Sequence, residues 1–256
     1  MKAFKNTDLS ITGKLKEQFN IRCREFDISA NWVTDKQLIH AHMELAGRPS
    51  GRALDLCCGT GQIGQALKQK GWDVRGLDLC GKMAEASSYF FPALEGKAEK
   101  IPFKTGSFSL VVCRQTFQFL NIKDVLSEVS RILVPGGILI VSLTVPFSGI
   151  DKPWLQEIHR VKQPLLLKFY TAEDLINELK EAGFLILENR RLRVRESINH
   201  WMDHAPELDL KIRQKVLAMI GNAPEEYRQL HHVDNVNGEI LEDWNWVILK
   251  TAFQIK

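Results

Sequence analysis

Two acidic side chains lie close to a glycine-rich turn early in the chain, at a spacing typical of a nucleoside-binding crevice. Residues 53–64 read Ala-Leu-Asp-Leu-Cys-Cys-Gly-Thr-Gly-Gln-Ile-Gly, so an apolar strand that carries Asp55 leads through Gly59 and Gly61 into a helix. Glycines at such a turn let the backbone bend sharply and let a ligand approach closely. Asp78 ends the next apolar run. Its carboxylate could accept hydrogen bonds from both hydroxyls of a ribose.

The position of Asp55 favours one kind of nucleoside over another. A diphosphate at the start of a helix needs backbone N–H groups and no carboxylate nearby. Asp55 lies two residues before the turn, where it would repel a diphosphate and attract an ammonium or sulfonium cation. S-adenosylmethionine carries both cations, whereas Asp78 would serve NAD equally well. Asp55 therefore favours S-adenosylmethionine, and an NAD-dependent oxidoreductase is left as an alternative.

The bulk composition is that of one α/β domain. The chain has 256 residues, 45% of them hydrophobic, and a formal net charge of +3, which is too small to indicate a nucleic-acid or membrane partner. No apolar run is long enough to span a bilayer, and the N-terminus lacks the apolar stretch of a signal peptide. Five cysteines, two of them adjacent, form no disulfide framework. We therefore expect a cytoplasmic protein.

Strands and helices that could position these side chains alternate after residue 46 in the manner of a parallel sheet. Short apolar runs predict strands at 52–57, 74–79, 94–99, 108–113, 138–143, 184–194 and 246–254. Glycine stops and helical spacing predict helices over 61–70, 80–89, 122–133 and 171–183.

Two further segments are expected to be mainly helical. Residues 1–46 form an N-terminal cap, helical from residue 7 with a break within 20–28, and residues 197–244 form an insertion between the last two strands. An insertion of that length in a compact fold serves as a substrate cover or an oligomer contact. We treat residues 1–256 as a single domain that includes both segments.

Residues 53–144 resemble the class I S-adenosylmethionine-dependent methyltransferases, in particular the methyltransferase type 11 and ubiquinone/menaquinone C-methyltransferase-like group. Four blocks carry the resemblance in the order that the family shows, and they are Leu54–Gly61, Leu77–Met83, Lys97–Val112 and Leu133–Leu139. The resemblance implies an α/β, Rossmann-like, doubly wound sheet of seven strands, mostly parallel with an antiparallel last strand. It also implies an enzyme that transfers a methyl group from S-adenosylmethionine and releases S-adenosylhomocysteine.

The resemblance also assigns the residues that would hold the cofactor. Asp55 and the backbone at Gly59 and Gly61 would hold the methionine part, and Asp78 would hold the ribose. Met83, Ala98 and Glu99 would flank the adenine. The full expected set is Asp55, Cys57, Gly59, Gly61, Asp78, Leu79, Met83, Ala98, Glu99 and Cys113.

Four residues depart from the usual pattern of that family, and one of them is Ser109, which replaces the usual aspartate of a Phe-Asp pair. Cys57 replaces the commoner first glycine of the turn. Lys97 stands where an aspartate often accepts a hydrogen bond from the adenine amino group, a bond that a lysine cannot accept. Gln118 stands where many relatives carry histidine.

Methyl transfer asks the protein mainly to align donor and acceptor and to exclude water, and a base is needed only if the acceptor must lose a proton early. Arg114 follows a strand at the ligand-binding edge and could pair with an acidic acceptor. His200 and His232, from two histidine clusters beside acids, could supply a base. We expect no metal, because the clusters lack a recognised ligand spacing. Candidate acceptor-binding residues are Gln118, Tyr170 and Trp201.

These observations favour an enzyme with a small-molecule acceptor, no membrane partner, and a monomeric or homodimeric state. Nucleic acid is disfavoured, although an RNA methyltransferase stays open because of the basic stretch Arg190–Arg195. A non-catalytic S-adenosylmethionine-binding module is the remaining alternative. The sequence does not identify the acceptor atom.

Overall fold

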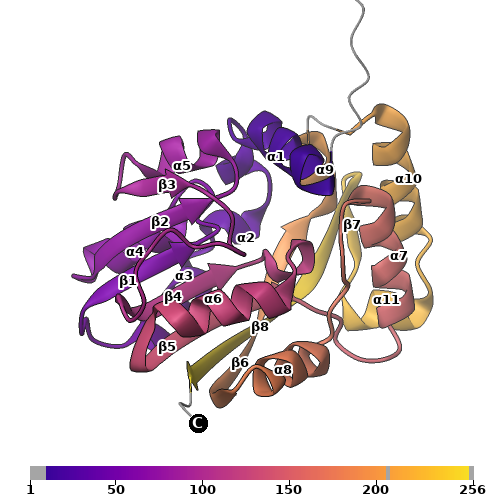
Figure 1. Ribbon diagram of the computed structural model, residues 1–256. Helices are drawn as coiled ribbons and strands as arrows, with labels where there is room; N and C mark the ends of the chain where they lie inside the picture. The colour runs from indigo at the N-terminus through magenta and orange to yellow at the C-terminus, as the bar shows by residue number, and fades with distance from the viewer. Residues whose placement is uncertain (1–9, 206–207, 254–256) are drawn as a thin grey trace, which may run out of the picture.

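The computed structural model describes residues 10–205 and 208–253, and these form one twisted sheet flanked by helices (Figure 1). Its strand order is β3-β2-β1-β4-β5-β8-β6, and a short strand β7 pairs with β8. The parallel strands are β1 (Arg52–Leu56), β2 (Asp73–Asp78), β3 (Ala93–Glu95), β4 (Phe108–Arg114) and β5 (Leu133–Thr144). Strand β8 (Glu239–Phe253) runs antiparallel to β5 and to β6 (Phe184–Ser197). This is the predicted Rossmann-like, mostly parallel sheet, extended by the hairpin strand β7.

Helices cover both faces of the sheet, which explains the continuous apolar strands. Helices α3 (Lys36–Ala46) and α4 (Gln62–Gln69) cover one face, and α6 (Ile122–Ile132) and α8 (Ala172–Glu181) cover the other. Successive side chains of a strand point to opposite faces. Val112 therefore belongs to the hydrophobic core beneath α3 and α4, and its neighbour Val111 belongs to the core beneath α6 and α8.

The N-terminal segment crosses the upper end of the sheet. Helix α1 (Ile11–Arg22) lies beside α5 (Gly81–Ser87), and η1 (Phe26–Ile28) and α2 (Asn31–Thr34) lead into α3 (Figure 1). The helical cap is therefore present from Ile11, with its break after Arg22. Residues 1–9 of the expected cap lie outside the described part of the chain.

The insertion is helical only in its first part. Helices α9 (Ile198–Asp203), α10 (Leu210–Gly221) and α11 (Glu225–Leu230) are followed by β7 (Asp234–Val236), and β6 and β8 are longer than the expected 184–194 and 246–254. The end of the insertion is a hairpin, because a tight turn at Asn237 and Gly238 joins β7 to β8. Both residues have positive φ, at 53° and 87°. An Asn-Gly turn of this kind joins two antiparallel strands.

A buried polar cluster fastens the insertion to the start of α7 (Lys152–Lys162). Asp151 Oδ2 lies 3.0 Å from His231 Nε2, and both side chains are almost fully buried. The Tyr227 ring stacks on His231 at 4.0 Å, and its hydroxyl donates to Glu242 at 3.0 Å. Breaking such a buried pair leaves an uncompensated charge, so the cluster stabilises this junction only as a unit.

Within the described residues, no helix has the length and apolar character to cross a membrane.

Candidate functional site

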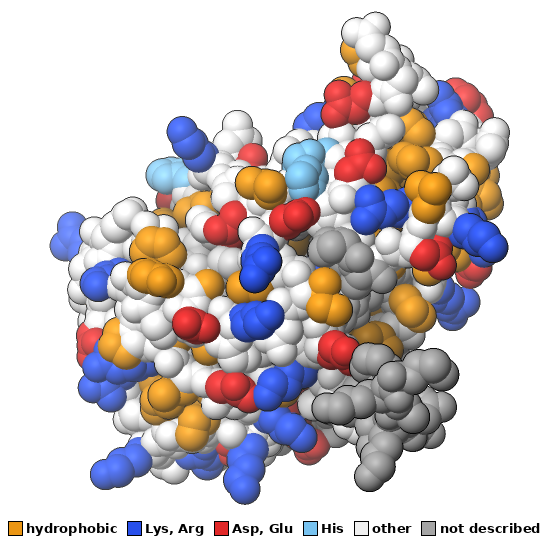
Figure 2. Space-filling view, turned by 90° about the horizontal axis from the view of Figure 1, so that it is seen from above, with side chains coloured by type: hydrophobic (Ala, Val, Ile, Leu, Met, Phe, Trp, Pro, Cys, Tyr) orange, Lys and Arg blue, Asp and Glu red, His pale blue; other side chains and the backbone are white. Residues whose placement is uncertain are grey.

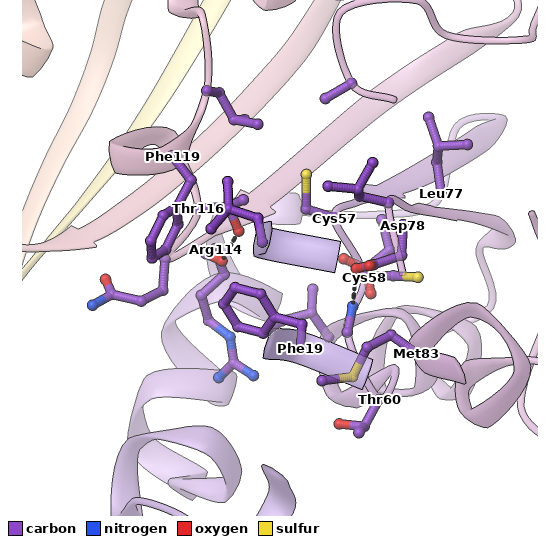
Figure 3. Close-up of a pocket in the computed structure, with 18 of the residues that line it drawn as sticks. Phe19, Cys57, Cys58, Thr60, Leu77, Asp78, Met83, Arg114, Thr116 and Phe119 are labelled. Carbon is purple, nitrogen blue, oxygen red and sulfur yellow. Dashed lines mark hydrogen bonds between the residues drawn. The ribbon is translucent and has the colours of Figure 1, made fainter. Parts of the chain in front are cut away.

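The candidate site is a cavity at the carboxyl ends of β1, β2 and β4, which is where open α/β sheets bind ligands. Most of the residues predicted to bind the cofactor line it, namely Asp55, Cys57, Gly59, Asp78, Leu79, Met83, Ala98 and Glu99. Figure 3 shows Asp78, Cys58 and Met83 on one side of the cavity and Arg114, Thr116 and Phe119 on the other. The fold thus brings together side chains from several strand ends.

The glycine turn is built from left-handed backbone. Cys57, Gly59 and Gly61 have φ values of 58°, 53° and 93°. A Cβ at Gly61 would lie 2.9 Å from the Ser87 Cβ, so this position also needs glycine for space. Cys57 adopts the left-handed conformation with a side chain, which is uncommon and costs energy. The departure of Cys57 from glycine therefore falls on a backbone position that favours glycine.

Asp78 organises the turn through both of its carboxylate oxygens. Oδ2 accepts from the Gly59 N–H at 2.9 Å (Figure 3), and Oδ1 accepts from the Cys80 N–H at 2.8 Å. Burial raises the Asp78 pKa to about 6, while these two hydrogen bonds oppose the shift. Each oxygen retains a lone pair. Asp78 can therefore also accept hydrogen bonds from ligand hydroxyls.

Asp55 is buried near the end of β1, and a backbone N–H group in the first turn of α4 hydrogen-bonds to its carboxylate. Its Oδ2 accepts from the Gly64 N–H at 2.7 Å. Burial raises the Asp55 pKa to about 7, although the Gly64 bond and the charge of Arg114 lower it. A cation in this cavity would favour the ionised carboxylate and relieve the unfavourable burial.

Arg114 lines the cavity and is half-buried, and its guanidinium forms no salt bridge with an acid of the described residues. Its guanidinium donates to the carbonyls of Trp32 at 3.3 Å and Val33 at 3.0 Å, and it lies 5.1 Å from the Trp32 ring centroid. Burial lowers its pKa to about 10, and the charge of Asp55 opposes this shift. In this structure Arg114 fixes α2 against the cavity.

An aromatic roof, Phe19, Phe26, Trp32 and Phe119, covers the cavity. The Phe19 ring lies 5.7 Å from Phe119 and 6.5 Å from Phe26, which in turn lies 6.0 Å from Trp32. The Thr60 hydroxyl donates to Asp27 of η1, which ties this roof to the glycine turn. The sequence predicts an N-terminal cap but does not single out these four rings, because they come from separate segments without a common spacing.

Two residues of the expected cofactor set do not line the cavity. Gly61 contributes a left-handed backbone conformation to the turn without lining the cavity, and Cys113 is fully buried in β4. Cys113 hydrogen-bonds with Cys57, and this bond together with burial raises the Cys57 pKa well above its usual range. The sulfur of Cys57 is therefore a neutral thiol in the cavity wall.

The structure places both candidate histidines outside this cavity. The ring of His200 hydrogen-bonds through Nε2 with the Ile28 carbonyl and lies 4.3 Å from the His204 ring. His232 is 60% exposed, with Nδ1 2.7 Å from Asp243 Oδ2. The packing of α9 and the hairpin turns both side chains toward protein partners at the surface. Neither reaches the carboxyl ends of β1 and β2.

The candidate acceptor-binding residues line two smaller cavities, one of which shares Gln115 with the first. Gln118 and Tyr170 line one, and Trp201 lines the other. His159 of α7 lines both, although sequence reasoning did not select it. A single histidine without a motif gives no signal in the sequence. Among the described residues, no cluster of three or more His, Cys, Asp or Glu side chains could hold a metal ion.

Comparison with known proteins gives the class of the fold. A family model described as a methyltransferase domain matches residues 54–141. A solved structure of a Bacillus halodurans putative methyltransferase superposes with a TM-score of 0.76 at 20% identity, over 85% of this chain and 99% of that one. A geranyl diphosphate C-methyltransferase of Streptomyces coelicolor, solved with S-adenosyl-L-homocysteine, gives 0.58 at 15% identity, over 86% and 81%. At these identities the superpositions show a shared fold.

Two curated relatives are closer in sequence. An uncharacterized methyltransferase of Synechocystis is 34% identical over 155 residues, 56% of this chain and 71% of the relative. A ubiquinone/menaquinone biosynthesis C-methyltransferase, UbiE of Desulfotalea psychrophila, is 31% identical over 190 residues, 61% of this chain and 75% of the relative. The chain belongs to the S-adenosylmethionine-dependent methyltransferases, and its cofactor is S-adenosylmethionine.

The residues of the cavity fit this cofactor. The Gly59 N–H, which a diphosphate would need, already donates to Asp78. The buried carboxylate of Asp55 suits a cationic amino-acid portion, and Asp78 suits a ribose. When bound, the cofactor supplies a methyl group that its own sulfonium activates. The NAD-dependent alternative is set aside for two reasons. The chain belongs to the methyltransferases, and the Gly59 N–H that a diphosphate would need is hydrogen-bonded to Asp78.

Proposed function

We propose that this methyltransferase binds its cofactor with the predicted residues and acts on a small molecule beneath the aromatic roof. Asp55 and the Gly59 backbone would hold the methionine part, Asp78 the ribose, and Met83 with Ala98 the adenine. One observation carries the proposal: two buried carboxylates at neighbouring strand ends face a cavity closed by aromatic rings. That arrangement combines recognition of a cationic nucleoside with a dry, apolar acceptor site.

The protein then contributes alignment and the exclusion of water to an in-line displacement. The roof keeps water from the reacting atoms, and the glycine turn holds the backbone close to the ligand. His200 and His232 lie outside the cavity, so we propose no role for them in proton transfer. Arg114 acts in this proposal as a positioning residue, since its hydrogen bonds fix α2 and hence Trp32.

We infer further that the protein acts in the cytoplasm as a monomer or homodimer and without nucleic acid. Basic side chains of β6 are neutralised by acids: Arg190 pairs with Glu44 at 2.6 Å, and Arg193 and Arg195 pair with Asp243 at 3.3 and 3.1 Å. On the face seen from above, positive and negative side chains are mixed (Figure 2). Neither observation favours a polyanionic partner.

Replacing Asp78 tests the proposal directly. In Asp78→Asn the amide nitrogen would face an N–H group, and the carboxylate would be lost, so we expect affinity for S-adenosylhomocysteine to fall by about tenfold to a hundredfold. Isothermal titration calorimetry measures this change.

Asp73→Asn is the matched control, because Asp73 lies at the opposite end of β2 and pairs with Arg52 and Arg75 at the surface. It should bind S-adenosylhomocysteine as the unmodified protein does. Equal affinity in both variants, or binding of NADH in place of S-adenosylhomocysteine, would refute the assignment.

A further inference from the structure

A small second cavity adjoins the cofactor cavity at the carboxyl ends of β4 and β5. Its wall includes Gln115, Gln118, Thr144, His159 and Tyr170. Gln115 lines both cavities, so its side chain lies in the wall between them. The second cavity is therefore next to the place where an acceptor must meet the cofactor.

The partition is rigidly built. Gln115 Nε2 donates to Thr144 Oγ1 at 2.7 Å, and Gln115 Oε1 accepts from the Thr144 N–H at 2.8 Å. The Gln115 backbone has a φ of 55°, a strained conformation for a residue with a side chain. Strain of this kind persists only where the surroundings fix it, and it concentrates at functional sites.

One buried polar atom of this cavity lacks a hydrogen-bond partner among the described residues. Gln118 Nε2 donates to the Gln115 carbonyl at 2.9 Å, which orients the amide, yet its buried Oε1 accepts no hydrogen bond. The His159 ring packs near Phe169 and Trp201, with centroids at 5.5 and 6.2 Å. A buried oxygen without a partner is costly, so it marks a place where a ligand donor would be favoured.

The charges around the cavity restrict what can bind there. Burial lowers the His159 pKa to about 4, with the charges of Lys162 and His231 adding to the shift, so the ring is neutral at physiological pH. Lys168, in the same wall, lies 4.7 Å above the Tyr170 ring and pairs with Glu178 at 2.6 Å. An anion would face the lone pairs of Gln118 Oε1, and a cation would face Lys168. A neutral donor avoids both penalties.

From these observations, and resting on the proposed methyl transfer, we propose that this second cavity anchors a neutral hydrogen-bond donor of the acceptor, a hydroxyl or an amide N–H. Gln118 Oε1 accepts this hydrogen bond, and His159 provides a second polar contact. The remainder of the acceptor lies beneath the aromatic roof, with the held Gln115 side chain beside it. Gln118 and His159 are thus specificity-determining residues.

Phenol and fluorobenzene test this proposal, because they have similar shapes and only phenol donates a hydrogen bond. Both are titrated into the full-length protein loaded with S-adenosylhomocysteine, with ¹³C-labelled histidine observed by NMR. His159→Phe identifies the His159 signal by its loss. We expect phenol to shift that signal saturably and to bind more tightly than fluorobenzene.

Gln118→Met keeps the size of the side chain and removes the acceptor oxygen. It should weaken phenol binding about fivefold and leave fluorobenzene unchanged, in keeping with the loss of one hydrogen bond. Gln229→Met, the same change at an exposed position of α11, is the control and should alter neither affinity.

Equal binding of the two probes, an unchanged phenol preference in Gln118→Met, or no response of the His159 signal would each overturn the proposal. S-adenosylhomocysteine affinity, measured by calorimetry in the same samples, is independent of this cavity. If cofactor binding is normal while phenol fails, the second cavity alone is refuted.

Discussion

The two carboxylates of the cofactor cavity differ in what holds them. Asp78 accepts two backbone hydrogen bonds from its own turn and the neighbouring one, whereas Asp55 accepts one from the start of α4. Asp55 therefore relies more on a ligand to balance its burial. Burial raises both pKa values, that of Asp55 to about 7 and that of Asp78 to about 6.

The shifted pKa values predict how cofactor binding depends on pH. The ammonium group of S-adenosylhomocysteine favours the ionised carboxylates, so binding should release protons below about pH 7, and the affinity should rise by up to about tenfold per pH unit there. Calorimetry at several pH values, in buffers of different ionisation enthalpy, measures both effects. In Asp55→Asn the profile should flatten; a flat profile in the unmodified protein would contradict this account.

The same groups affect the stability of the unliganded protein with the opposite sign. Their folded-state pKa values lie above the ordinary value of about 4, so the folded protein holds protons that the unfolded chain loses. Their contribution to stability is complete below about pH 4 and is lost as the pH rises through about 6 to 7. Cofactor binding therefore compensates at neutral pH for the cost of burying these acids.

At the level of elements, the packing of α4 against β1 depends on Gly64. A Cβ at this position would lie 2.2 Å from Phe91 Cζ and 2.9 Å from Asp55 Oδ2. The close approach lets the Gly64 N–H reach Asp55 at 2.7 Å. The packing of the helix and the geometry of the site are therefore set by one contact.

We expect Gly64→Ala to lower the free energy of unfolding by about 1–3 kcal/mol, because Phe91 has to move within a packed core. The displaced helix should also weaken S-adenosylhomocysteine binding. Urea unfolding followed by circular dichroism gives the first value. Gly149→Ala is the control, since a Cβ there meets nothing within 4 Å, and its change should stay within about 0.5 kcal/mol. Similar values for the two variants would show that the helix tolerates the methyl group.

At the scale of the whole molecule, α2 links the cofactor cavity to the C-terminal half. Glu196 at the end of β6 accepts from the N–H groups of Asn31 at 2.8 Å and Trp32 at 2.7 Å, while Arg114 of β4 holds the same short helix by its carbonyls. Burial raises the Glu196 pKa to about 8, although the two N–H groups lower it. Helix α2, which carries Trp32 of the roof, is therefore held by side chains of both β4 and β6.

This arrangement predicts that the cofactor orders the roof. Hydrogen exchange followed by mass spectrometry should show slower exchange in Ile11–Asn31 on addition of S-adenosylhomocysteine, because these residues gain a packed ligand beneath them. Helix α8, on the opposite face of the sheet, serves as the internal control and should not change. Protection confined to β1 and α4 would show that the roof does not respond to the ligand.

Several features of the fold were predictable because their causes are local. The turn after β1 and the acid at the end of β2 each depend on a few consecutive residues, and parallel strands bring their carboxyl ends to one edge. Asp55 and Asp78 therefore meet in one cavity as predicted. The Asn237-Gly238 turn was also a local signal, and reading it would have corrected the expected helical end of the insertion.

The sequence by itself determined the sheet, the glycine turn and the choice of a cationic nucleoside, because neighbouring residues decide them. Only the tertiary structure decided that Arg114 contacts Trp32, that His200 and His232 face other partners, and that Gln118 meets His159 beside the cofactor cavity. These contacts join residues as much as 172 positions apart. They arise from how whole elements pack, so no local pattern of residue types encodes them.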